Sequence, residues 1–197
     1  LIDSVLILMN LDELNLINRL ISEIMPIEAE RNLYLQILST GLDGKCLEHI
    51  NIIAGYGRNG KGFVSDLLLR ALGNYAMIGN NAILFENNKT GSNPEKANIH
   101  KKRLVIFREP SEYKKFNNAT IKELTGGGKF SSRGHYENIS QKELNLTMLI
   151  ECNKRPLFIE EPTAAETERL IDINFRSTFT INEKLVDHTK NIYLANS

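Results

Sequence analysis

Three things are scarce in this sequence, and each scarcity excludes a class of protein. The 197 residues include two cysteines, Cys46 and Cys152, which lack the close pairing of a zinc site. Two cysteines cannot build a disulfide framework, so we expect a reducing, cytoplasmic compartment. The longest uncharged apolar stretch, 4–11, is too short to span a bilayer and lacks the flanks of a signal peptide. We therefore expect no membrane partner.

Net charge is also absent, because 24 basic residues balance 24 acidic ones. The balance hides a change of sign along the chain. Residues 1–50 carry eight acids and three bases, whereas residues 98–142 carry ten bases and four acids. A basic sector of this size suits a nucleic-acid backbone, although a solvated charged surface would have the same composition.

A hydrophobic content of 42% is typical of a globular domain. Because the sequence begins at Leu1 rather than Met, we expect it to be part of a longer protein. Apolar residues at helical spacing predict a first helix, and Pro26 suits the first turn of a second one that ends near Gly41. We expect residues 1–41 to form a small helical collar and residues 42–197 to form the main domain.

Residues 55–62 read GYGRNGKG and lie between a predicted strand, 48–54, and a predicted helix that ends at Gly73. Glycine-rich loops in this context turn backbone N–H groups toward phosphates, while a lysine supplies charge to the terminal phosphates. The octet therefore predicts ATP binding. The residues we expect to bind are Gly55, Gly57, Arg58, Asn59, Gly60, Lys61 and Gly62.

The last position of the octet departs from the usual motif. A Ser or Thr normally follows the lysine and touches Mg²⁺ through its hydroxyl, and this chain has Gly62 there. Nucleotide binding is therefore better supported than hydrolysis.

Two further polar residues follow predicted strands. The apolar run 104–107 ends at Arg108 and Glu109, and the run 144–152 ends at Asn153. Ligands of open α/β sheets bind at the carboxyl ends of strands. Glu109 is suited to hold Mg²⁺ through water and to accept a proton from an attacking water, and Asn153 is suited to orient that water.

The segment between these two strands predicts an Asn118-capped helix up to Leu124, then a hairpin of two strands, 129–136 and 144–152. The turn 137–142 carries Lys142 at its tip. Later, a helix from Pro162 to about Arg169 precedes a strand at 171–175. An exposed arginine such as Arg169 is usually solvated, but it is also the form that an arginine finger takes.

The order of these motifs over 42–179 resembles superfamily 3 helicases, and more narrowly the primase-helicases of poxviruses, giant DNA viruses and some phages. The similar stretches are GYGRNGKGFVSDLLLRALGNYA, KKRLVIFREP, IKELTGGGKFSSRGHYEN, LTMLIECNKRP and ERLIDINF. The resemblance implies an α/β fold of the AAA+-like P-loop NTPase class, with a mostly parallel sheet flanked by helices. It also implies a ring, usually a hexamer, that moves 3′ to 5′ on single-stranded DNA at a replication fork and works with other replication proteins.

The resemblance also assigns roles to single residues. Lys61 matches the Walker A lysine, Glu109 the Walker B acid, Asn153 the sensor asparagine and Arg169 the arginine finger. It implies ATP and Mg²⁺ as cofactors, with Glu109 as the residue that holds Mg²⁺ through water. DNA contacts are implied for a pore hairpin that carries Lys129, Arg133, His135 and, foremost, Lys142.

Three positions depart from the family pattern: Gly62, Arg108 where a second acid is frequent, and Gly128-Lys129 where an Asp often follows the glycines. Two alternatives therefore stay open. One is a degenerate nucleotide-binding ring that tethers DNA or replication partners without unwinding. The other is a P-loop kinase of another class, for which phosphorylation of a nucleoside without DNA would be diagnostic.

Overall fold

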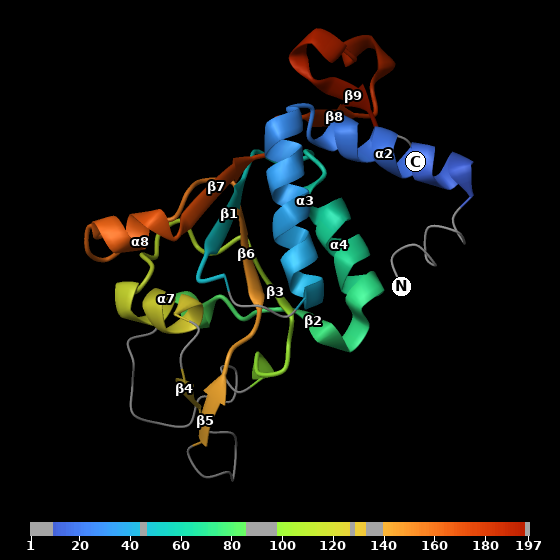
Figure 1. The fold of residues 1–197 in the computed structure, drawn as a ribbon. Coiled ribbons are helices and arrows are strands. Elements are labelled where there is room, and N and C mark those ends of the chain that lie inside the picture. The colour runs from blue at the N-terminus through green and yellow to red at the C-terminus, as the bar shows by residue number, and fades with distance from the viewer. Residues whose placement is uncertain (1–9, 44–46, 86–97, 127–128, 133–139, 196–197) are drawn as a thin grey trace.

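The computed structural model describes residues 10–43, 47–85, 98–126, 129–132 and 140–195, and their centre is a parallel five-stranded sheet (Figure 1). The strands lie in the order β2-β3-β6-β1-β7, and each neighbouring pair is parallel. Their bounds are β1 Ile50–Ala54, β2 Ala76–Ile78, β3 Leu104–Arg108, β6 Thr147–Cys152 and β7 Leu170–Asn174. The predicted α/β class with a mostly parallel sheet is confirmed.

Helices cover both faces of this sheet. The described helices are α2 (Leu11–Ile24), α3 (Glu28–Asp43), α4 (Lys61–Leu72), α5 (Ala82–Phe85), α7 (Asn118–Thr125) and α8 (Ala164–Glu168). Three 3₁₀ turns, η1 to η3, span Gly73–Tyr75, Glu183–Leu185 and His188–Lys190. Two small sheets stand outside the main one: β4 (Lys129–Ser132) with β5 (Ser140–Glu143), antiparallel, and β8 (Thr178–Thr180) with β9 (Ile192–Leu194), parallel.

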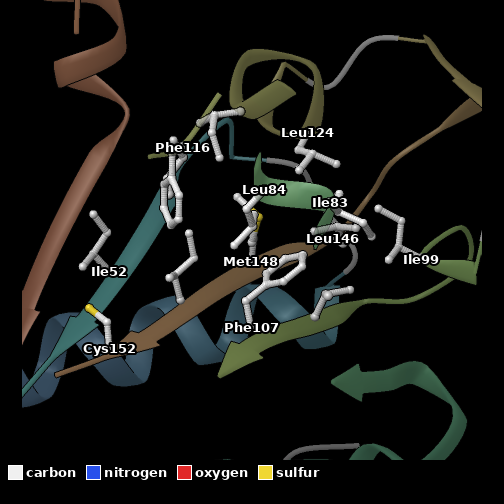
Figure 2. Packing of buried hydrophobic residues seen from close by; sticks show 14 of the residues in the cluster. Ile52, Ile83, Leu84, Ile99, Phe107, Phe116, Leu124, Leu146, Met148 and Cys152 are labelled. Carbon is white, nitrogen blue, oxygen red and sulfur yellow. The ribbon is translucent and has the colours of Figure 1, made fainter. Parts of the chain in front are cut away.

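Central strands of a parallel sheet are buried on both faces, and their sequences are accordingly continuous apolar runs. One face of the sheet packs against α5 and α7 through residues such as Phe107, Phe116, Ile121 and Met148 (Figure 2). On the other face, Ile53, Ile106 and Leu149 pack beneath α3 and α4. The two clusters hold the sheet between two layers of helices, so the carboxyl ends of its strands remain free to form a site.

Helix α3 lies directly on the sheet, beside α4 (Figure 1). Tyr34 and Ile37 of α3 are buried in the same cluster as Ile53, and the Tyr34 ring meets that of Phe175 edge to face at 5.3 Å. Only the end of α2 joins this cluster, since Ile24 is buried while Ile17 is 45% exposed. The boundary between a collar at 1–41 and a core from residue 42 stays a prediction.

The hairpin prediction was partly wrong. Residues 144–152 do not pair with 129–132, the described part of the first predicted strand, because the chain divides at 144–146. The first part, β5, pairs with β4, whereas β6 joins the main sheet between β1 and β3. Lys142 consequently lies within β5, opposite Phe130, rather than at the tip of a turn.

Smaller differences concern helix caps and short strands. The N-cap of α7 is Asn117, whose side chain accepts a hydrogen bond from the Thr120 N–H, so the predicted cap at Asn118 was one residue late. The short edge strand β2, beside β3, has no counterpart among the predicted strands. Among the described helices, none combines the length and hydrophobicity that a bilayer span requires.

Candidate functional site

The octet 55–62 forms the connection from β1 to α4. Gly60 precedes the helix in the left-handed conformation, with φ of 88°, and a Cβ atom there would lie 2.8 Å from Ile24 Cγ1. Arg58 also has a positive φ, 61°. This backbone brings the start of α4, whose first N–H groups have no partner inside the helix, to the carboxyl end of β1. The connection is therefore a cradle for an anion.

Lys61 is the first residue of α4 and is only 6% exposed. Its Nζ donates a hydrogen bond to the Gly55 carbonyl oxygen, and its backbone N–H donates to Asn59 Oδ1 at 3.3 Å. Burial lowers the pKa of the Lys61 ammonium, while the nearby Cys152, Glu151 and Glu109 oppose that change. A buried cation with a carbonyl partner is incompletely compensated, so an anion beside it would be favoured.

A cavity of about 570 Å³ opens over the cradle. Its walls are the loop and first helical turn, together with four polar residues at or next to the carboxyl ends of β3 and β6. The lining residues are Gly57, Arg58, Asn59, Gly60, Lys61, Gly62, Phe63, Arg108, Glu109, Glu151 and Asn153. Thus six of the seven predicted ATP-binding residues line one cavity with Glu109 and Asn153, and Gly55 is held to it through Lys61.

The sheet register explains why these residues meet. Arg108 pairs with Glu151, and the Glu109 N–H donates to the Glu151 carbonyl at 2.8 Å. Gly55 is bonded in the same way to the Cys152 carbonyl at 3.2 Å. The three strands β3, β6 and β1 therefore end level with one another, and the residues that follow β3 and β6, Glu109 and Asn153, line the cavity.

Glu109 has a backbone conformation that is unusual for its type. Its φ is 46°, in the left-handed region that costs a residue with a Cβ about 1–3 kcal/mol. Strain of this kind gathers at functional sites, where the surrounding structure maintains it. The turn after β3 thus directs the chain sharply away while leaving the exposed Glu109 at the cavity.

Arg169 lies at the opposite end of the sheet. It precedes β7, and its carbonyl accepts a hydrogen bond from the Ile50 N–H at the start of β1. Five-residue strands separate it from the cradle, which corresponds to roughly 16 Å. Its guanidinium pairs with Glu48 at 3.0 Å, and the residue does not line the cavity. The structure does not bring Arg169 together with Lys61, Glu109 and Asn153 within one chain.

Three cavity residues escaped sequence reasoning as site residues: Phe63 and the two charged residues Arg108 and Glu151. Arg108 Nη2 lies 2.7 Å from Asp66 Oδ1 and also contacts Ser65 Oγ, and Arg108 Nε lies 3.4 Å from Glu151 Oε2. Burial raises the pKa of the Glu151 carboxyl, against the opposing effects of Ser65, Arg108 and Lys61. Period-two alternation back from Asn153 along β6 would have pointed to Glu151.

A second, mainly apolar cavity of about 640 Å³ adjoins the first. It shares Arg58, Gly60 and Phe63 with the cradle cavity and extends to α2 and to the β8–β9 sheet. Leu16, Leu20, Phe179 and Ile181 are among its other walls. The Phe179 N–H donates to the Arg58 carbonyl at 2.7 Å, which connects the C-terminal sheet to the cradle.

Two of the four predicted DNA-binding residues lie in the small hairpin. Lys129 lies in β4, opposite Glu143, and Lys142 lies in β5. Arg133 and His135 fall outside the described residues. The hairpin extends beyond the main sheet, past α7 (Figure 1).

The comparisons with known proteins agree with these motifs. No family model matches the chain. The chain is 32% identical over 165 residues to the protein named Primase D5 of fowlpox virus, covering 81% of this chain and 21% of that protein. It is 29% identical over 166 residues to a protein named "Putative helicase" of Acanthamoeba polyphaga mimivirus, covering 83% of this chain and 17% of that protein. The chain thus spans about a fifth of the length of these curated relatives.

The fold has a solved counterpart. The apo structure of the NrS-1 C-terminal region superposes with a TM-score of 0.61 at 15% identity, covering 89% of this chain and 41% of that one. At such low identity the likeness concerns the fold alone. In sequence, the chain is similar to viral proteins named as a primase and a helicase, and in fold it is similar to the NrS-1 C-terminal region.

Proposed function

We propose that this chain is the ATPase core of a viral replicative helicase of the superfamily 3, AAA+-like type. The observation that carries the proposal is the cavity in which Lys61, Glu109 and Asn153 meet over the cradle. A phosphate cradle, a carboxylate and an amide at level strand ends are the parts that triphosphate hydrolysis needs. The sequence similarity to viral proteins named primase and helicase supports replication as the context.

The cavity fits a triphosphate with Mg²⁺. A Cβ atom at Gly55 would lie 2.4 Å from Asn59 Nδ2, so packing inside the loop leaves no room for a larger residue there and fixes the path of the cradle. Among the described residues, no group of three His, Cys, Asp or Glu side chains could hold a metal ion. Mg²⁺ commonly binds through one or two carboxylates plus substrate phosphates, so it would arrive with the nucleotide, and Glu109 would hold it through water.

The apolar cavity is suited to the base of the nucleotide. It joins the cradle at Arg58, Gly60 and Phe63, and such walls bury a flat aromatic ring favourably. We therefore assign the phosphates to the cradle cavity and the base to the neighbouring one.

Each polar residue then has a chemical task. Lys61 gives up its carbonyl partner for the terminal phosphates and neutralises their charge. Glu109 accepts the proton of the attacking water, and Asn153 orients that water because its amide both donates and accepts. Mg²⁺, when bound, supplies Lewis-acid stabilisation of phosphate charge.

Arg169 completes the site from a neighbouring subunit in this proposal. It is too far from its own cradle, and its ion pair with Glu48 is partly exposed, with side chains 31% and 50% accessible. Exchanging a partly solvated carboxylate for a phosphate costs little. A ring, usually a hexamer, supplies such a neighbour at every seam.

DNA would pass along the hairpins in the centre of the ring. Lys142 is the leading contact in this proposal, and Lys129, Arg133 and His135 are further candidates. Backbone contacts by these side chains would be tolerant of sequence and would weaken with salt, because counterion release drives them. Hydrolysis at a seam would shift the hairpin and move the strand in the 3′ to 5′ sense.

The test is ATP turnover and fork unwinding by the full-length protein, with and without single-stranded DNA. Lys61→Ala should reduce DNA-stimulated turnover by roughly 100-fold or more, since it removes the charge on the terminal phosphates. Lys102→Ala is the matched control, because Lys102 Nζ contacts only a surface carbonyl, that of Asn74, among its recorded hydrogen bonds. Equal turnover by wild type and Lys61→Ala would overturn the proposal.

Two residues favour a second candidate, a nucleotide-binding ring without motor activity. Gly62 lacks the usual hydroxyl and Arg108 stands where a second acid is frequent, so Glu109 would be left without two of the groups that commonly support the metal. This candidate predicts tight nucleotide and DNA binding by wild type with no stimulated turnover, and the same experiment therefore separates the two.

A further inference from the structure

Four polar side chains form a network along one wall of the cradle cavity. Arg108 at the end of β3 contacts Ser65 and Asp66 of α4 and Glu151 of β6. Ser65 Oγ lies 3.4 Å from Glu151 Oε2 and 3.1 Å from the Gly62 carbonyl oxygen. The network therefore connects the position that lacks a hydroxyl, Gly62, to the position that lacks an acid, Arg108.

The network keeps a net negative charge although position 108 is basic. The Arg108 guanidinium faces two carboxylates, Asp66 and Glu151, so the three side chains together carry one negative charge. Of the two carboxylates, Asp66 is 59% exposed, whereas Glu151 is only 4% exposed at its side chain and lines the cavity. The negative charge inside the cavity wall thus comes from β6.

Glu151 uses only one of its oxygens within the protein. Oε2 faces Ser65 and Arg108, but Oε1 is buried and has no hydrogen-bond partner among the described residues. Leaving a buried carboxylate oxygen unsatisfied is costly. A counter-ion for Arg108 needs Oε2 alone, so that role does not explain Oε1. A ligand in the cavity does, because Glu151 and Asn153 alternate onto the same side of β6 and both line it.

We propose that Glu151 is a second carboxylate on the metal side of the nucleotide site, acting from β6 in place of an acid at position 108, and that Arg108 positions it. This inference rests on the proposed binding of Mg²⁺ and ATP. Mg²⁺ keeps several waters and takes one or two carboxylates, so Glu151 and Glu109 together meet its usual requirement. The chain then needs neither a hydroxyl at Gly62 nor an acid at Arg108.

The experiment measures the affinity of the full-length protein for ADP and for AMP-PNP, with and without Mg²⁺. Glu151→Gln keeps the shape of the side chain and removes its charge. We expect affinity without Mg²⁺ to be unchanged and the gain on adding Mg²⁺ to fall by about 10-fold or more. Glu112→Gln is the control, since Glu112 is an exposed carboxylate outside the cavity that pairs with Lys154.

A direct reading of the metal comes from Mn²⁺, whose binding in the presence of ADP is followed by electron paramagnetic resonance. Glu151→Gln should weaken Mn²⁺ binding to the same extent as it reduces the Mg²⁺ gain. Glu151→Asp retains the charge on a side chain that is one methylene shorter, so its Mn²⁺ affinity should lie between those of wild type and Glu151→Gln. An unchanged Mn²⁺ affinity in Glu151→Gln would overturn the inference. Glu151→Asp also serves if the glutamine variant does not fold.

A double variant separates the metal role from a counter-ion role. Arg108→Met alone should reduce the Mg²⁺ gain only in part, because Glu151 keeps its charge but loses the side chain that positions it. Arg108→Met/Glu151→Gln should lose the gain entirely. Recovery of the gain in the double variant would show that Glu151 only neutralises Arg108 and would overturn the inference. If wild type binds neither nucleotide, the proposed function fails with it; if wild type shows a Mg²⁺ gain that Glu151→Gln retains, only the inference fails.

Discussion

At the scale of single residues, the cradle departs from the usual motif at Gly62. Its position in the first turn of α4 is open, since a Cβ atom there would meet nothing within 4 Å. A hydroxyl can therefore be added without a clash. The absence of a side chain at Gly62 is a property of the sequence and is not imposed by packing.

Gly62→Ser should strengthen Mg²⁺-dependent nucleotide binding about 3- to 10-fold, because one hydrogen bond to a charged group contributes roughly 1 kcal/mol or more. Titration of ADP in the presence and absence of Mg²⁺ measures this. Gly62→Ala is the matched control, since it gains the same helix propensity without the hydroxyl. If the alanine variant gains as much as the serine variant, the effect comes from the helix and the assignment of the metal side to this end of the cradle is wrong.

Residue by residue, the sequence was sufficient for the cradle and for Glu109, because Gly-rich loops and strand ends have local signatures. It was insufficient for Glu151 and Arg108. Their roles depend on the register of β3 against β6, and this pairing joins residues more than forty positions apart. Arg169 lies at the opposite end of the sheet from the cradle, so in the proposed ring it would meet a triphosphate only across a seam between subunits.

At the scale of elements, α8 connects the residue proposed as a finger to the base of the hairpin. Glu166 of α8 caps its own helix by accepting from the Thr163 N–H at 2.7 Å, and it also lies 3.3 Å from Lys122 Nζ and from Asn118 Nδ2 of α7. Arg169 follows α8, and α7 precedes β4. Hydrogen bonds from the backbone and side chain of Thr163, together with those from Asn118 and Lys122, lower the pKa of Glu166 to about 2.

Glu166→Gln should destabilise the fold by about 1 kcal/mol at neutral pH, as loss of a capping interaction does. Because the folded pKa lies below the ordinary value of 4.5, the charged Glu166 stabilises fully above about pH 4.5, and this contribution disappears as the pH falls toward 2. Urea unfolding at several pH values should therefore show that the difference in unfolding free energy between wild type and variant becomes smaller as the pH falls from about 4.5 toward 2. The control is Glu168→Gln on the exposed side of α8. A gap that stays constant with pH would contradict the account.

The hairpin β4–β5 carries the predicted DNA contact. Lys142→Ala should weaken binding of single-stranded DNA and reduce the slope of log affinity against log salt by about 0.7, while basal ATP turnover is unchanged. Fluorescence anisotropy over a salt series measures both quantities. Lys184→Ala, in η2 on the far side of the molecule, is the control for loss of one positive charge (Figure 1). Equal salt slopes for the two variants would move the contact elsewhere.

Helices and strands with a clear local apolar pattern were predicted correctly. The prediction failed where the partner strand determines to which sheet a segment belongs. The helix α4 and the strands β1, β3 and β7 were predicted in place, because their apolar patterns and caps are local. The run 144–152 was predicted as one strand, since Leu144, Leu146 and Met148 alternate without a break. All three are buried in the structure, on both sides of the point where the chain passes from the hairpin to the main sheet. The apolar pattern in the sequence therefore gives no sign of that change. Strands of three residues, such as β2, are too short to show a period.

At the scale of the whole molecule, the order β2-β3-β6-β1-β7 places β1 and its cradle between β6 and β7. β6 brings Glu151 and Asn153 to the cavity, while β7 begins beside Arg169 at the other end of the sheet. One chain therefore has the cradle at one end of its sheet and, at the other end, a partly exposed arginine that is paired with Glu48. Such an arrangement suits a head-to-tail ring, in which each subunit completes the next.

The most direct test mixes two inactive variants. Lys61→Ala has an intact arginine but no working cradle, and Arg169→Ala has the reverse. If Arg169 acts on a neighbour, a one-to-one mixture of full-length subunits should regain DNA-stimulated ATP turnover, because about one quarter of its seams combine an intact cradle with an intact arginine. Turnover that stays at the level of the separate variants would contradict the account.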